Sequence, residues 1–207
     1  RHALSNTVKP VQGPGIQFGH EVRYAVEMAA VVGIHAHDLT LSLSPVSPLT
    51  MHDIAAQAIM DMAKHGVIHA NLPCPTGGAT SPMTITGSVI QQSAESLAPL
   101  VLAQIINPGC GVVYCGRLAM LEPRTGLLWA GVELGLSSAA TVQLGHHYGF
   151  AVNVYGFSTN AHTLDAQSAF ERGLNAAIPA LAGADELSGI GEMEAGVTGS
   201  FAQMVLD

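Results

Sequence analysis

Charged side chains are scarce in this sequence, and positively charged ones most of all. Only 11% of the 207 residues are charged, and 7 Lys and Arg stand against 15 Asp and Glu, for a formal net charge of −8. Without a cluster of Lys and Arg, the chain lacks the electrostatic footprint of a nucleic-acid-binding protein. Because 48% of the residues are apolar, the composition is that of a folded domain and excludes a disordered chain.

Cysteine is also scarce, and the long apolar stretches are interrupted by proline and glycine. The three cysteines are Cys74, Cys110 and Cys115. This odd number, with no disulfide framework and no C-x-x-C spacing, favours buried hydrophobic packing over a metal site and favours a reducing, cytoplasmic compartment. We expect no signal peptide, because the first residues do not have the charged and apolar regions of one. The longest uncharged apolar stretch, Leu97–Gly116, contains Pro99 and Pro108, so we expect no membrane span there.

Neither end of the sequence resembles a natural terminus. The chain starts with Arg1, and it ends at Asp207 directly after the apolar stretch Phe201–Leu206. A chain of 207 residues can bury one sizeable core but not two comfortable ones. We therefore expect residues 1–207 to be a single domain that is a fragment of a longer protein, and we expect the isolated fragment to be unstable or to aggregate.

Short apolar segments alternate with segments of helical periodicity. The strand-like segments are 39–43, 67–72, 111–115, 151–155 and 184–187. The helical segments are 21–32, 51–64, 88–106, 131–148 and 164–181, with a last helix from about residue 200. This alternation predicts an α/β fold with about five βα units around a parallel sheet. Both a partial (β/α)8 (TIM) barrel and an open doubly wound sheet fit, although no dinucleotide fingerprint or Walker loop supports the second.

Apolar stripes predict which faces of two helices are buried. In the helix at 88–106 the stripe consists of Ile90, Ala94, Leu97, Val101 and Ile105. In the helix at 164–181 it consists of Phe170, Leu174, Ala177, Ile178 and Leu181, with Thr163 as a candidate cap.

Functional residues of either fold lie in the loops that follow the carboxyl ends of the strands. After the first two strands these loops contain Ser42, Ser44, Ser47, Asn71, Cys74, Thr76, Gly77, Gly78, Thr80 and Thr84. After the later strands they contain Cys115, Arg117, Glu122, Arg124, Tyr155, Gly156, Ser158, Asn160, His162, Ser188, Glu192 and Glu194.

Two of these loops suggest specific chemistry. The glycines of loop 75–82 permit positive φ and close approach of a ligand, and its amides suit an anion, but a long turn capped by hydroxyls fits equally well. Glu192 and Glu194 flank Met193 in a Gly-rich turn. Carboxylates there suit a cationic substrate or general acid–base catalysis, with a solvated loop as the alternative.

Several short motifs occur in a fixed order. They are SPVSPL at 44–49, GGATSPMTITG at 77–87, LAQIINPG at 102–109, DAQ at 165–167 and VLD at 205–207. The second resembles the G-A-T-x-P-x-T-x-x-G loop, and the third the L-A-Q-L-x-x-P-G element, of the trimethylamine methyltransferase family. The resemblance to these corrinoid-dependent methylamine methyltransferases covers roughly residues 26–207.

The resemblance implies a TIM barrel, of which this chain would hold about half. It also implies methyl transfer from an amine nitrogen to the cobalt of a separate corrinoid protein, so the corrinoid belongs to the partner and this chain binds no cofactor tightly. The complete enzyme is expected to be a homo-oligomer. Some members carry pyrrolysine, which we place in the loop after 151–155. Here that loop reads Gly156-Phe157-Ser158-Thr159-Asn160, which favours the subgroup acting on quaternary amines such as glycine betaine over trimethylamine.

The same resemblance gives roles to residues around the barrel mouth. We expect Glu192, Glu194 and Ser158 to be catalytic. We expect the substrate-binding residues to be Gly78, Thr80, Thr84, Tyr155, Gly156, Phe157 and His162, with Tyr155 and Phe157 offering π faces to a quaternary ammonium. The competing hypotheses are a small-molecule-binding α/β module without catalysis and another TIM-barrel enzyme.

Overall fold

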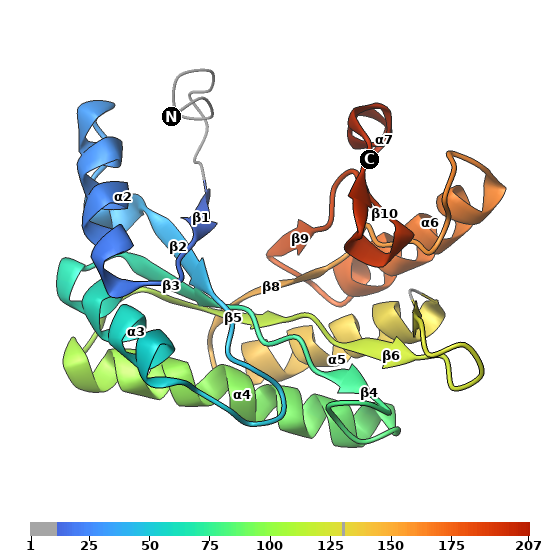
Figure 1. Ribbon diagram of the computed structural model, residues 1–207, viewed down its shortest axis with the longest axis horizontal. Helices are drawn as coiled ribbons and strands as arrows, with labels where there is room; N and C mark the ends of the chain where they lie inside the picture. Colours follow the sequence, from blue (N-terminus) through green and yellow to red (C-terminus); the bar gives the residue numbers. More distant parts are fainter. Residues whose placement is uncertain (1–11, 130) are drawn as a thin grey trace. The chain divides into compact units, whose positions relative to one another are not determined.

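The computed structural model describes residues 12–129 and 131–207 (Figure 1). The described chain divides into two compact units. The first holds residues up to Leu72 together with Ala94–Tyr114, and the second holds Pro73–Ser93 together with Cys115–Asp207. Helix α4 (Ile85–Ile106) and strand β5 (Val112–Gly116) each begin in one unit and end in the other.

The first unit is built on parallel strands that follow one another in chain order. Its strands are β1 (Gln12–Gly15), β2 (Thr40–Leu43), β3 (Ile68–Asn71) and the start of β5, and each pairs in parallel with the strand before it. Its helices are α2 (Gly19–Val31), the short 3-10 helix η1 (Ala36–Asp38) and α3 (Asp53–His65). Helix α3 ends at Gly66, whose φ of 71° is a left-handed conformation that glycine adopts without strain.

The core of the first unit lies between its strands and helices α2 and α3. Val22 from α2, Leu41 from β2, and Ile59 and Met62 from α3 are all fully buried. Burial of such side chains stabilises the fold by roughly 1.5–3 kcal/mol each. This core fixes the direction of β2 and β3, and therefore the place where the loops after them begin.

The second unit continues the same pattern of strands and helices. After the end of β5, the sheet continues with β8 (Ala151–Tyr155) and then β9 (Glu186–Ser188), and β8 and β9 are parallel. Helices α5 (Val132–His147) and α6 (Ala166–Leu181) pack against each other, and a short helix α7 (Phe201–Leu206) closes the chain (Figure 1).

Short strands outside the main sheet carry the loops of the second unit. Strands β4 (Thr76–Gly77), β6 (Ala119–Leu121) and β7 (Leu128–Trp129) form one small sheet. Strands β10 (Glu192–Met193) and β11 (Thr198–Gly199) form an antiparallel hairpin around the 3-10 turn η2 (Glu194–Gly196).

The order of the strands decides between the two predicted architectures. In a doubly wound sheet the order reverses at a switch point, whereas in a TIM barrel each strand lies beside the one that precedes it. Within each unit every main strand follows its predecessor without a reversal. The predicted fold class, an α/β partial (β/α)8 barrel, is therefore confirmed.

The predicted buried faces of two helices are wrong in part. Ile90, Val101 and Ile105 of α4 are 66%, 56% and 70% exposed, and Phe170 and Leu181 of α6 are 68% and 89% exposed. The inward residues of these helices include several polar ones, namely Ser88, Gln92, Ser96, Ser168, Arg172 and Asn175. Apolar periodicity misses such faces because it assumes that polar groups seek water, whereas buried polar groups are retained when they find hydrogen-bond partners.

Specific hydrogen bonds hold these inward polar side chains. In the first unit Asn71 Nδ2 donates to the carbonyl oxygen of Glu95 at 2.8 Å. In the second unit Gln92 Nε2 donates to Thr141 Oγ1 at 2.6 Å, and Asn175 Oδ1 accepts from the Gly135 amide at 3.0 Å. Strand β1 was also missed, because its sequence QGPG carries none of the β-branched or aromatic residues typical of strands.

Helix α6 begins at a cap that sequence analysis assigned to the wrong residue. Asp165, not Thr163, is the N-cap, and its Oδ1 accepts a hydrogen bond from the Ser168 amide at 3.0 Å. We expect Asp165→Ala to lower the free energy of unfolding by about 1 kcal/mol, because this amide loses its acceptor. Urea denaturation of the complete protein measures the loss. Asp165→Asn, which keeps an acceptor, is the matched control, and equal losses from the two variants would argue against the cap.

Candidate functional site

Glu192 has an unusual environment for a carboxylate in a loop. It lies in β10, and its amide donates to the Gly189 carbonyl oxygen at 3.0 Å. Its Oε2 is buried and has no hydrogen-bond partner among the described residues. Burial raises the pKa of the Glu192 carboxyl above its usual value, while the charges of Arg117 and Arg172 oppose that rise. A buried acceptor without a donor is costly in a folded protein and is often found at functional sites.

Arg117 and Tyr155 share this environment. The Arg117 guanidinium carbon lies 4.7 Å from the centre of the Tyr155 ring, which is a cation–π contact. Arg117 Nη1 donates to the Gly116 carbonyl oxygen at 3.2 Å, and Nη2 donates to Asn153 Oδ1. Burial, and then the Glu192 charge, raise the pKa of the Tyr155 hydroxyl. We call Arg117, Tyr155 and Glu192 the Glu192 cluster.

The chain topology explains why these three residues lie in one region of the second unit. Arg117 directly follows β5, Tyr155 is the last residue of β8, and Glu192 lies in the loop after β9. These three strands are neighbours in the sheet, and their carboxyl ends lie at one edge. In (β/α)8 proteins this edge is where the chemistry takes place. The Glu192 cluster thus lies where the active sites of this fold are found.

The segment Gly156–Ser158 is held against β9. The amides of Gly156 and Phe157 both donate to the Ser188 carbonyl oxygen, at 3.0 and 3.2 Å. Ser158 is only 6% exposed, and its carbonyl oxygen accepts from Asn175 Nδ2 at 3.2 Å. A Cβ on Gly156 would lie 3.0 Å from Leu187, so a side chain there would have to displace that neighbour. This segment therefore forms a rigid continuation of β8 beside Tyr155.

Glu194 and His162 form a separate pair. Glu194 Oε1 lies 3.0 Å from His162 Nδ1, and the His162 side chain is 80% exposed. Glu194 and Ala195 both have φ of 53°, and the Ala195 amide donates to the Thr159 carbonyl oxygen at 2.7 Å. Glu192 and Glu194, to which the sequence gives the same role, therefore have different environments. Glu192 is half-buried near Arg117, whereas Glu194 contacts an exposed imidazole.

The Gly- and Thr-rich loop after β3 is organised by its own hydrogen bonds. Thr80 Oγ1 accepts from the Thr76 amide at 2.9 Å, and Thr84 Oγ1 accepts from the Gly87 amide at 3.2 Å. The Gly78 amide donates to the Ser81 carbonyl oxygen at 2.9 Å, with a Gly78 φ of 87° that favours glycine. These contacts lie within the loop or join it to the first turn of α4, so a capped turn accounts for its residues.

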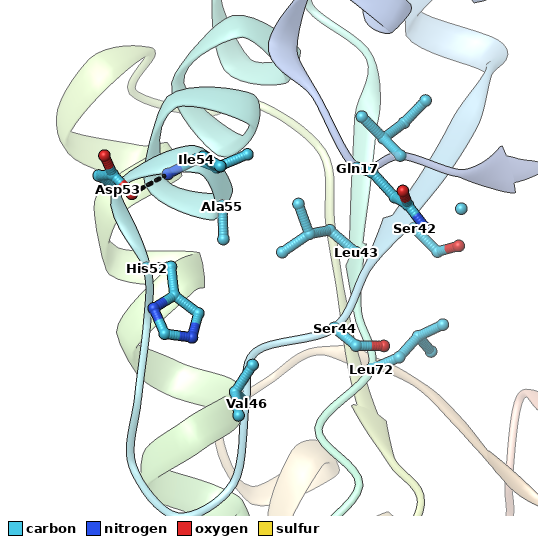
Figure 2. Close-up of a pocket in the computed structure, with 12 residues that line it drawn as sticks. Gln17, Ser42, Leu43, Ser44, Val46, His52, Asp53, Ile54, Ala55 and Leu72 are labelled. Atoms are coloured by element: carbon cyan, nitrogen blue, oxygen red, sulfur yellow. Dashed lines mark hydrogen bonds between the residues drawn. The ribbon is translucent and has the colours of Figure 1, made fainter.

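The first unit has a cavity of its own, of about 610 Å³ (Figure 2). Ser42 and Leu43 from β2, Ser44 after it, Leu72 after β3 and the start of α3 line it. Glu95 anchors the loop beside this cavity, because its Oε2 accepts from Ser47 Oγ at 2.6 Å and its Oε1 from the Leu49 amide at 2.9 Å. The volume suits a small molecule, but the lining is mainly apolar, with Asp53 as its ionisable acid.

Cysteine and histidine do not build a metal centre in the described chain. Among residues 12–129 and 131–207, no three His, Cys, Asp or Glu side chains gather as metal ligands. In the same residues, no helix is both long and apolar enough to cross a membrane. Cys115 is buried in β5, and burial raises the pKa of its thiol to about 12. A thiol of this kind packs as a hydrophobic group and is a poor nucleophile.

Sequence analysis found most of the loops but missed partners within them. It placed Arg117 after the third strand without giving it a role, although a lone cation directly after the buried strand VVYCG is a detectable signal. It gave no role to Asn153, whose side chain holds Arg117, nor to Arg172, which acts on Glu192 from helix α6.

Comparison with known proteins places these motifs in one family. Residues 21–207 match the family described as trimethylamine methyltransferase (MTTB). The chain is 35% identical to the trimethylamine methyltransferase MttB of Methanosarcina barkeri over 169 residues, which are 81% of this chain and 34% of that protein. It is 29% identical to the MttB of Desulfitobacterium hafniense over 200 residues, 93% of this chain and 40% of that protein.

A relative with a different substrate in its name also matches. The glycine betaine methyltransferase of Desulfitobacterium hafniense is 35% identical over 132 residues, which are 62% of this chain and 27% of that protein. The chain spans about a third of the length of the first of these relatives.

Proposed function

The chain belongs to the trimethylamine methyltransferase family, and we propose that it forms the donor side of a methyltransferase site that moves a methyl group from a methylated amine to cobalt. The acceptor is a corrinoid carried by a cognate partner protein, so the chain itself holds no cofactor tightly. The donor is trimethylamine or a quaternary amine such as glycine betaine. The complete enzyme works as a homo-oligomer in the cytoplasm.

The observation that carries this proposal is the buried Oε2 atom of the half-buried Glu192 side chain. Its Oε2 has no hydrogen-bond donor among the described residues. A quaternary ammonium group carries a positive charge but has no N–H to donate. Such a cation needs a negative charge and apolar or aromatic faces instead of hydrogen bonds. Glu192 supplies the charge, and the Tyr155 ring lies in the same cluster.

The proposed reaction breaks the bond between the nitrogen and one methyl carbon. The bonding electrons stay on nitrogen, so a quaternary amine, or trimethylamine in its protonated form, leaves as a neutral amine. The reduced cobalt of the partner supplies the electron pair for the new bond. A quaternary nitrogen already carries the positive charge that this departure requires. The task of this chain is therefore to hold the donor in line with the acceptor and to exclude misaligned approaches.

Arg117 favours a donor that carries its own carboxylate. Its guanidinium acts on Glu192 and stacks on Tyr155, so a negative and a positive side chain occur in one cluster. A zwitterion such as glycine betaine would set its ammonium against Glu192 and its carboxylate against Arg117. Trimethylamine offers nothing to Arg117.

A carboxylate-binding Arg117 makes the effect of Arg117→Gln depend on the donor. We expect kcat/KM with glycine betaine to fall by about tenfold or more, because a charge-assisted hydrogen bond to the donor carboxylate is lost. The rate with trimethylamine should change far less. Steady-state kinetics with both donors measures the ratio, and equal losses for the two donors would argue against carboxylate binding by Arg117. Arg124→Gln, at an exposed residue of the same unit, is the matched control.

The proposed activity is tested with the complete enzyme, its reduced corrinoid protein and each amine in turn. Methylation of cobalt changes the visible spectrum of the corrinoid, so the reaction is followed directly. We expect the spectral change to require both the enzyme and a methylated amine. An unchanged corrinoid spectrum with every donor would reject methyl transfer in favour of a binding module without catalysis.

A further inference from the structure

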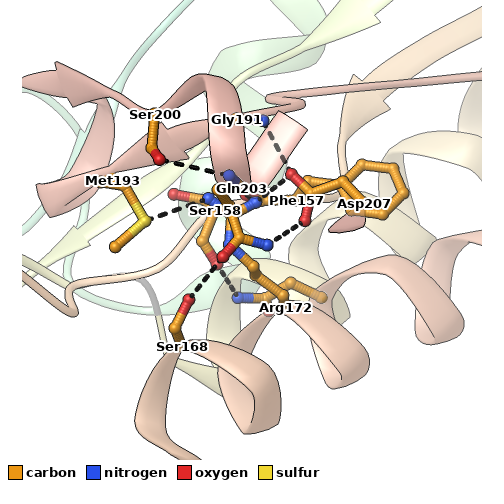
Figure 3. A network of polar contacts seen from close by, with 10 residues as sticks. Phe157, Ser158, Ser168, Arg172, Gly191, Met193, Ser200, Gln203 and Asp207 are labelled. Atoms are coloured by element: carbon orange, nitrogen blue, oxygen red, sulfur yellow. Dashed lines mark hydrogen bonds and ion pairs between the residues drawn. The ribbon is translucent and has the colours of Figure 1, made fainter. Parts of the chain in front are cut away.

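A buried ion pair joins helix α6 to the end of the described chain (Figure 3). Arg172 Nη1 and Asp207 Oδ2 are 2.6 Å apart, and their side chains are 4% and 3% exposed. Asp207 Oδ1 also accepts from Gln203 Nε2 at 2.6 Å, and the Gln203 amide donates to Ser200 Oγ at 3.2 Å. The Arg172 and Asp207 side chains are removed from water, so the contacts that they make depend on one another.

This ion pair contacts the residues on both sides of Glu192. The Gly191 amide donates to Asp207 Oδ2 at 2.7 Å. Arg172 Nη2 lies 3.6 Å from Met193 Sδ, and Met193 is 4% exposed. Figure 3 shows Gly191 contacted by Asp207 and Met193 contacted by Arg172. The backbone that carries Glu192 is therefore held at the residue before it and at the residue after it.

The same arginine also holds the loop after β8. Arg172 Nη1 donates to the Phe157 carbonyl oxygen at 2.5 Å. Phe157 lies two residues beyond Tyr155, and its own amide donates to Ser188. One guanidinium thus ties together helix α6, the segment that follows Tyr155 and the hairpin that carries Glu192.

The hairpin around Glu192 needs such support. Strands β10 and β11 have only two residues each, and the turn between them contains Glu194 and Ala195 with φ of 53°. Short hairpins are marginally stable by themselves, and non-glycine residues with positive φ persist only when their surroundings fix them. The ion pair holds the hairpin from outside at Gly191 and Met193, while the amides of Glu194 and Ala195 in the turn donate to the carbonyl oxygens of Ala161 and Thr159.

We propose that Arg172 and Asp207 are positioning residues that hold Glu192 in the orientation required for methyl transfer. The inference rests on the proposed role of Glu192 in that reaction. Neither residue touches the donor, and both act through the Gly191–Met193 backbone. Their loss should therefore matter for activity only while Glu192 has its carboxylate.

A double-mutant cycle in the complete enzyme tests this coupling. The variants are Arg172→Gln, Arg172→Lys and Asp207→Asn, each made in the wild-type and in the Glu192→Gln background. Arg172→Gln and Asp207→Asn should lower kcat by about tenfold to a hundredfold in the wild-type background, because a small displacement of a catalytic group has effects of that size. Arg172→Lys, which keeps the charge, should recover part of the loss.

In the Glu192→Gln background the same substitutions should change kcat by less than about twofold, since the group they position is absent. Losses of equal factor in both backgrounds would overturn the proposal and leave a purely structural ion pair. Met62→Ala, which destabilises the core of the first unit, is the control for an effect of lower stability alone.

A second measurement does not depend on activity. The carboxyl ¹³C signal of Glu192 in Glu-labelled complete enzyme, assigned by its loss in Glu192→Gln, reports the pKa of that group. Arg172→Gln should raise this pKa, because the Arg172 and Arg117 charges both oppose its rise and one of them is then lost. An unchanged pKa would overturn the coupling even in an enzyme that transfers no methyl group, whereas a raised pKa without methyl transfer would reject only the proposed function.

Discussion

Replacing Glu192 by Gln is expected to lower kcat/KM for methyl transfer by about 10²- to 10³-fold, the size of effect seen when one preorganised electrostatic contact is removed from an active site. The substitution keeps the shape of the side chain and removes its charge. Because Oε2 accepts no hydrogen bond among the described residues, folding does not depend on that charge. The melting temperature should therefore stay the same or rise slightly.

Glu194→Gln is the matched control for this prediction. Glu194 is two residues away, but its partner is the exposed His162, and exposed ion pairs contribute little. We expect its kcat/KM to stay within about threefold of wild type. The kcat/KM and the melting temperature of both variants, measured side by side, test whether Glu192 acts in the reaction. Similar losses of activity in the two variants, or a fall in melting temperature that matches the loss in Glu192→Gln, would remove Glu192 from the site.

Acid is expected to destabilise the first unit through His69. This residue of β3 is 1% exposed, and its ring nitrogens have no hydrogen-bond partner among the described residues. Burial lowers the pKa of the His69 imidazole from 6.5 to about 4. The neutral ring is therefore the form that the folded protein accepts, and protonation favours the unfolded chain.

The direction of the pH effect follows from this depressed pKa. Between pH 6.5 and about 4 the unfolded chain binds a proton at His69 that the folded protein does not. Above pH 6.5 neither state binds a proton at His69, so His69 causes no pH dependence there. As the pH drops from 6.5 to about 4, the free energy of unfolding falls, by roughly 3 kcal/mol at the lower end.

Urea denaturation of the complete protein at pH 7 and at pH 4 measures the loss. In His69→Leu the difference between the two pH values should shrink by about 3 kcal/mol relative to wild type, whereas substitution of the exposed His147 by Gln should leave it nearly unchanged. An equal pH dependence in wild type and His69→Leu would mean that the imidazole finds a partner or water in the folded protein.

Local periodicity predicted the two strands that lead to Arg117 and Tyr155, but not β10, which carries Glu192. The strand at 151–155 was predicted with its observed ends, because a β-branched run bounded by Gly149 and Gly156 has one reasonable interpretation. The alternation of strands and helices also predicted where functional loops begin. The position of Glu192 in the loop after the last main strand followed from that rule.

Contacts between distant segments could not be predicted in the same way. Arg172 looks like a solvated residue of an amphipathic helix, and its partner Asp207 lies 35 positions away. Nothing local signals that the two meet in a buried pair or that they bracket Glu192. The sequence does not reveal the different environments of Glu192 and Glu194 for the same reason. These environments depend on Arg117 and His162, which lie outside the Gly-rich turn.

The most direct test of the account is a crystal structure of the complete enzyme with a methylated ammonium donor bound. We predict that a methyl group on nitrogen lies about 3.5–4 Å from the Glu192 carboxylate, with the Tyr155 ring against the same ammonium. A donor bound in the cavity between β2 and α3, or on the loop at 76–84, with Glu192 facing no ligand, would contradict the claim.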